Sequence, residues 1–274
     1  MIGNPFQERV RVAGANTDRD PSAEIWRHFK PQRMNLNFDD FRTFGGAAST
    51  YTGEAGIWRS YQDTGATVAP LATEVNGVLQ LDTSATDNDI CAIQLGSTTS
   101  VQTQISRGVT TAGTDKEVLF EARIRVGQVS DNYNLFVGLM EENSIADSFF
   151  VDSGGAVIDK DYVGFVVNEG DGDALDIEYK KSGETAQNTS AVKALAASTW
   201  YKVGILYLPN APTDEKVRFY IDGEQASDAD ISLTNMAAST FPDEEEMGVV
   251  IGIGAAAATA MTVDIDWVAV AQAF

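Results

Sequence analysis

The sequence predicts an all-β protein: a two-sheet antiparallel jelly-roll sandwich with an N-terminal extended arm. Many short segments between turn residues alternate apolar and polar residues at period two, which is typical of strands with one buried face. The body, residues 36–274, has almost no pattern at helix period. It also lacks a repeat at a fixed spacing of 20–50 residues, so a solenoid is not expected.

The clearest alternation lies in two segments, 200–207 and 216–224. In the first, four residues fall on the face we expect to be buried: Tyr201, Val203, Ile205 and Tyr207. Asp222-Gly223 at the end of the second segment tolerates the positive φ of a tight turn. These segments predict two antiparallel strands of a large sheet.

Further strands are predicted along the body, at 77–82, 89–95, 118–126, 135–140, 162–167, 175–179, 247–253 and 263–270. The segment 118–126 alternates most cleanly, and its expected inward residues are Phe120, Ala122, Ile124 and Val126.

Composition excludes several classes of function. The 274 residues carry a formal net charge of -21, which argues against nucleic acid and anionic membrane as partners. No run of 18 apolar residues predicts a membrane span, and the start of the chain has no apolar signal-peptide core. Cys91 and His28 are single, so no intrachain disulfide, zinc site or triad is expected; Cys91 is interpreted as a buried apolar residue.

Residues 1–35 form the predicted arm, with a short helix over about 21–29 that Asp20 and Pro21 would start. The arm holds six Lys and Arg against four acids, on a strongly acidic body. It could dock on an acidic neighbour or fold onto its own body, and both alternatives stay open. If the arm docks on a neighbouring subunit, the residues expected to contact that subunit are Arg9, Arg11, Arg19, Trp26, Arg27, Phe29, Lys30 and Arg33.

The body resembles the concanavalin A-like lectin/glucanase (laminin-G-like) superfamily. The resemblance lies in 38–41, 120–125, 136–139, 162–165, the 200–223 hairpin and 264–267. It implies that the first and last strands pair, with Phe41 and Trp267 as neighbours in the core.

A narrower resemblance, to structural proteins of tailed phages, lies in 136–142, 161–165 and 170–173. It implies a non-enzymatic capsid decoration protein, made in the host cytoplasm and located on the capsid surface. Its partners would be the major capsid protein or other virion subunits, and it would form a homo-oligomer on the particle.

Glycan cleavage needs two carboxylates beside the scissile bond. Asp176 and Glu178 share a strand face, as do Asp264 and Asp266, but we interpret both pairs as outward charges on an exposed face. Glu121, Arg123 and Arg125 are read as a cross-strand charge ladder. No catalytic residue is therefore expected.

The alternative function is a carbohydrate-binding or glycan-cleaving domain of a phage tail or cell-surface protein. Trp58 and Tyr61, in a region rich in small residues, could form a platform for a sugar. No cofactor is expected, although Asp171 and Asp173 in a glycine-containing turn are metal candidates and calcium is the open alternative.

Overall fold

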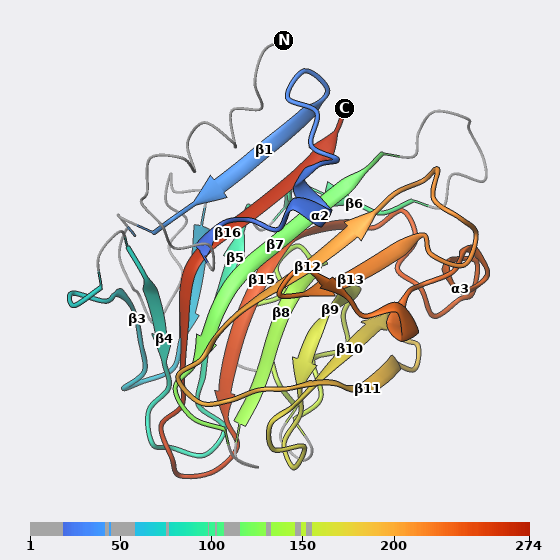
Figure 1. Ribbon diagram of the computed structural model, residues 1–274. Coiled ribbons are helices and arrows are strands. Elements are labelled where there is room, and N and C mark those ends of the chain that lie inside the picture. The colour runs from blue at the N-terminus through green and yellow to red at the C-terminus, as the bar shows by residue number, and fades with distance from the viewer. Residues whose placement is uncertain are drawn as a thin grey trace.

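Two eight-stranded antiparallel sheets pack face to face in the computed structural model (Figure 1). The structure describes residues 19–41, 44, 58–74, 77–97, 99–101, 103–106, 116–129, 133–145, 149–151 and 155–274. The predicted two-sheet sandwich is confirmed. Within these residues, no helix is both long and apolar enough to cross a membrane.

Sheet A lies in front in Figure 1. Its path runs through seven strands, and β1 (Met34–Asp39) pairs with β16 beside it. In order, the seven are β14 (Glu224–Gln225), β13 (Val217–Ile221), β12 (Trp200–Tyr207), β7 (Val118–Val126), β16 (Thr262–Ala273), β4 (Leu79–Asp82) and β3 (Thr67–Pro70).

Sheet B lies behind it. Its path also has seven strands, and β6 (Thr103–Gln104) pairs with the start of β15. The seven are β11 (Gln187–Ala194), β10 (Ala174–Lys180), β9 (Tyr162–Val167), β8 (Tyr133–Glu141), β15 (Glu246–Ala255), β5 (Ile90–Leu95) and β2 (Trp58–Gln62). The helices are short: α2 (Ala23–Trp26), η2 (Ser227–Ala229) and α3 (Leu233–Met236).

The main core lies between the sheets and follows the predicted alternation. Phe120 on β7 is paired with Ile205 on β12 and Val270 on β16, and all three are buried. Phe165 of sheet B meets Phe219 of sheet A edge to face, with ring centroids 5.7 Å apart. Aromatic contacts of this geometry join the two layers.

The first and last strands pair as expected, but the predicted neighbours Phe41 and Trp267 are on different sides of sheet A. Phe41 is in the core against Trp58, whereas Trp267 stacks on Phe38 at 6.2 Å on the outer face. The cause is a register shift in β16 between Ile265 and Trp267. Such a bulge changes which face the following side chain occupies.

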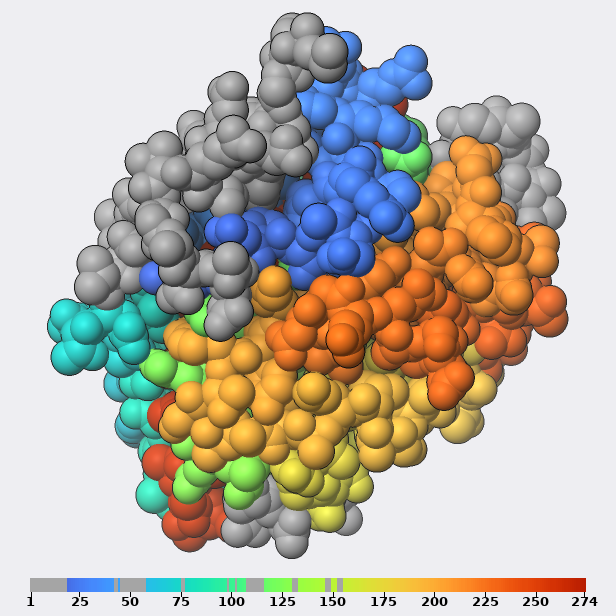
Figure 2. All heavy atoms as spheres, in the orientation of Figure 1, coloured from blue at the N-terminus to red at the C-terminus, as the bar shows by residue number. Residues whose placement is uncertain are grey.

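Residues 19–33, called the strap from here on, lie across the outer face of sheet A. Ile25, Trp26 and Phe29 are buried there against Leu119 and Leu206. In Figure 2 the atoms of this segment, in blue, lie on the surface directly against those of the orange strands. Of the two alternatives for the arm, its described part therefore folds onto its own body.

Candidate functional site

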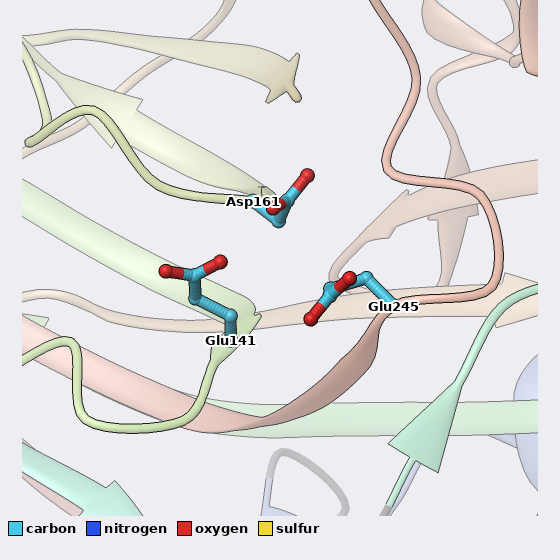
Figure 3. Close-up of side chains that lie close together, drawn as sticks. All are labelled: Glu141, Asp161 and Glu245. Carbon is cyan, nitrogen blue, oxygen red and sulfur yellow. The ribbon is translucent and has the colours of Figure 1, made fainter. Parts of the chain in front are cut away.

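Three carboxylates from distant parts of the chain converge at one end of sheet B (Figure 3). Glu141 ends β8, Asp161 comes directly before β9, and Glu245 comes directly before β15. Because β8 lies between β9 and β15, its end brings the three side chains together. One oxygen of each lies within 4.8 Å of the others.

The carboxylates of this trio affect one another electrostatically. Burial and the neighbouring Glu141 raise the pKa of Asp161 to about 6, although its carboxylate accepts a hydrogen bond from the Ser182 amide at 3.3 Å. Burial, with the charges of Glu141 and Glu142, also raises the pKa of Glu245. Lys160 lies 2.5 Å from Glu141 and offsets part of the negative charge.

The trio could supply three oxygen ligands to a hard cation. Calcium takes six to eight oxygens, so further positions would remain for water or a ligand. The predicted metal candidates Asp171 and Asp173 are exposed and lie outside this cluster. Sequence spacing gave no signal for the trio, because its members are up to 104 positions apart.

A second polar group lies on the outer face of sheet B. Asp176 and Glu178 on β10 were expected to be exposed, but they are only 4% and 7% exposed. Asn188 on β11 donates to Asp176 at 2.8 Å, and Tyr162 on β9 bonds to Glu178. Burial raises the pKa of Glu178, and the hydrogen bonds that Glu178 accepts from Tyr162 and, at 3.4 Å, from Asn188 oppose the rise.

A bulge in β11 helps to cover Asp176. The pairing of β10 with β11 shifts register after Leu175, and Ala191 adopts a φ of 55°. This conformation turns the Ala191 amide toward Asp176, to which it donates at 2.6 Å. A residue outside the regular ladder thus covers part of the sheet face.

Asp264 and Asp266 also differ from the expected exposed charges. Asp266 is 1% exposed and pairs with Arg123 at 2.7 Å and with Arg19 of the strap. Asp264 pairs with Arg125 at 2.7 Å. Of the predicted charge ladder, Arg123 and Arg125 pair across strands with these acids of β16; Arg123 is buried and Arg125 is half-buried. Glu121, the third predicted member, bonds to the strap instead.

The structure does not bring the two predicted sugar-platform residues together. Trp58 and Tyr61 are three positions apart on β2, so they point to opposite faces of the strand. Trp58 donates to Asp39 at 2.8 Å beside the main core, and Tyr61 donates to Asp63 at 2.7 Å on the outer side. They cannot form a single platform.

The predicted contact residues of the arm divide into three groups. Arg9 and Arg11 lie outside the described residues. Trp26 and Phe29 were expected to contact another subunit, but they are 4% and 8% exposed because they pack on their own sheet A. The remaining four are charged: Arg19 pairs with Asp266, Lys30 pairs with Glu117, and Arg27 and Arg33 are exposed.

No protein-family model and no curated relative matches this chain. Solved structures do share its fold. An endo-β-1,4-glucuronan lyase of the fungus Trichoderma reesei is 13% identical, with a TM-score of 0.56 over 85% of this chain and 94% of the other. Peanut lectin is 13% identical, with a TM-score of 0.54 over 87% and 97%. A Bacteroides ovatus GH16 protein from a mixed-linkage glucan PUL, in complex with a product, is 9% identical, with a TM-score of 0.51 over 85% and 98%.

The chain has a concanavalin A-like jelly-roll fold. The structures that share it are a lectin and glycan-cleaving enzymes, and none of these three is a phage protein. They contradict the expectation that the chain is not an enzyme, because two of the three are enzymes. Identities of 9–13% support the fold alone.

Proposed function

We propose that this chain is a carbohydrate-binding domain whose saccharide site includes Glu141, Asp161 and Glu245. The observation that carries the proposal is the fold, which the chain shares over 85% or more of its length with peanut lectin and two glycan-cleaving enzymes. The saccharide site is placed at the trio because its carboxylates can accept hydrogen bonds from sugar hydroxyls. A hard cation held there would leave coordination positions that hydroxyl oxygens can fill.

A glycan array tests this proposal, with the full chain applied in calcium and in chelator. We expect binding that falls in chelator and is lost in Asp161→Asn. Asp159→Asn is the matched control, because Asp159 is an exposed acid nearby that lies outside the trio. An array without hits for a folded wild-type chain, or equal binding by both variants, would contradict the proposal.

Glycan cleavage is the second candidate, because two of the three structures that share the fold are glycan-cleaving enzymes. The Asp176–Glu178 pair is the candidate for the two carboxylates, although neighbouring side chains and β11 cover it in this structure. The raised pKa of Glu178 is the property of a general acid, and its neighbour Asp176 is a second carboxylate on the same face. Release of reducing ends from glycans by the wild type, and its loss in Glu178→Gln, would support cleavage. An unchanged rate in this variant would assign any activity to other residues.

Attachment to a phage capsid remains a prediction from the sequence resemblance. In this prediction the chain binds the major capsid protein and is located on the virion surface. Mass spectrometry of purified particles with a copy count would test it, independently of glycan binding.

A further inference from the structure

The edge strand β11 covers a pair of carboxylates on the outer face of sheet B. Asn188 of β11 donates to Asp176 at 2.8 Å and to Glu178 at 3.4 Å, and the Ala191 amide donates to Asp176 at 2.6 Å. Tyr162, on the strand at the other side of β10, bonds to Glu178. Both carboxylates are buried as a result.

Strand β11 itself is held less firmly than the central strands of sheet B. In the described part of the chain it is the last strand of the sheet and pairs with β10 alone. Its side chains are exposed or half-buried, and Val192 contacts the main core only as a partly buried residue. Ala191 has a φ of 55°, which is unfavourable for a residue with a Cβ. Strands with few buried contacts open locally at a lower free energy than core strands.

The surroundings of Glu178 disfavour its charged form while β11 is in place. Removal from water destabilises an ionised carboxylate, and the nearby carboxylate of Asp176 adds to this effect. In the turn before β10, Asp171 places a further acid beside Asp176. Lys180 favours the charged form of Glu178, but its ammonium is also paired with Asp159 at 2.9 Å.

The charge of Glu178 and the position of β11 are therefore linked. The hydrogen bonds from Tyr162 and Asn188 oppose the effect of burial, and the pKa of Glu178 is still raised. When β11 moves away, water reaches this carboxylate and its pKa returns toward the ordinary value. The covered state thus binds a proton more tightly than the open state. Cover is favoured at low pH and is weakened as pH rises through the pKa of the covered state.

We propose that β11 is a pH-dependent cover of the Asp176–Glu178 pair, which stays closed while Glu178 is protonated and opens more often once Glu178 is charged. Opening exposes both carboxylates at the edge of sheet B. The consequence for glycan cleavage rests on the second candidate function: a glycan would reach the pair through this opening. The opening itself depends only on the contacts of β11 and the charge of Glu178.

Hydrogen exchange of the β11 amides tests the cover in the full chain without glycan. Between about pH 4 and 8, protection corrected for the intrinsic pH dependence of exchange should fall about tenfold in the wild type, the change that one unit of raised pKa produces. Amides of the central strand β8 should keep their protection. In Glu178→Gln, whose side chain stays neutral, β11 should be equally protected at both ends of this range.

The matched control is Glu184→Gln, which removes an exposed acid from the turn between β10 and β11 and should behave as the wild type. Constant protection of β11 in the wild type, or an equal fall in Glu178→Gln, would overturn the proposal. If Glu178→Gln does not fold, the wild-type series decides: a fall confined to β11 supports the cover, and constant protection overturns it. A chain that cleaves no glycan would leave this result unchanged, so the two proposals fail separately.

Discussion

The indole of Trp26 donates a hydrogen bond to the carboxylate of Glu121 at 2.7 Å, across 95 positions of sequence. Both residues are nearly inaccessible to solvent, at 4% and 1% exposure. Burial alone raises the pKa of Glu121, and its hydrogen bonds to the strap oppose this effect. A buried carboxylate on the outer face of a sheet is stabilised here by a segment that sequence reasoning placed outside the body.

Trp26→Ala should therefore destabilise the whole chain. Loss of the buried ring should lower the free energy of unfolding by about 3–5 kcal/mol, the usual range for a large aromatic residue in a core. Urea denaturation followed by circular dichroism measures the change. The neighbouring exposed Arg27→Ala should stay within about 0.5 kcal/mol. A loss of unfolding free energy in Trp26→Ala as small as that in Arg27→Ala would show that the strap adds little to stability.

Asp266→Asn should be similarly destabilising. It removes the carboxylate charge beside Arg123, whose side chain is 7% exposed, and breaking a buried pair costs about 3–5 kcal/mol. Glu117→Gln is the control, because its partner Lys30 is 51% exposed and such a pair contributes about 1 kcal/mol or less. In thermal unfolding at two salt concentrations, the destabilisation caused by Glu117→Gln should depend on salt, whereas that caused by Asp266→Asn should not. A small effect of Asp266→Asn would contradict the assignment of this pair as a structural anchor.

The raised pKa of Asp161 predicts a pH dependence of stability. The pKa rises from 3.8 to about 6 in the folded chain, so between these values the folded state binds more protons than the unfolded state. The contribution of this group to stability is therefore full at low pH and is lost as pH rises through about 6. Asp161→Asn should reduce the fall in unfolding free energy between about pH 4 and 6. If the slope of unfolding free energy against pH is unchanged in this variant, Asp161 is not the source of the pH dependence.

Much of the fold was predictable from the sequence because most core strands alternate at period two. The exceptions have physical reasons. Strand β11, Gln187–Ala194, is an edge strand with polar and exposed residues, so it carries no alternation. The bulge in β16 put Trp267 outside the core, since periodicity alone does not reveal an extra residue in a strand.

The candidate site was mostly not predictable. Glu141 ends β8, whereas Asp161 and Glu245 come directly before β9 and β15, and only the strand order β9–β8–β15 brings them together. Asp176 and Glu178 were recognised as a pair, but Asp176 is covered by the β11 bulge and Glu178 by Tyr162 and Asn188, and the sequence indicates neither. Trp26 was predicted to be a contact residue of the arm, and its partner Glu121 was found only in the structure.

The most direct test of carbohydrate binding is amide chemical-shift mapping with the saccharide that binds best on the array. We expect the largest shifts at the amides around the trio, including Glu141, Ser182 and Glu245, and no such shifts in Asp161→Asn. Saturable shifts confined to another surface, or no shifts at any saccharide concentration, would contradict a sugar site at this end of sheet B.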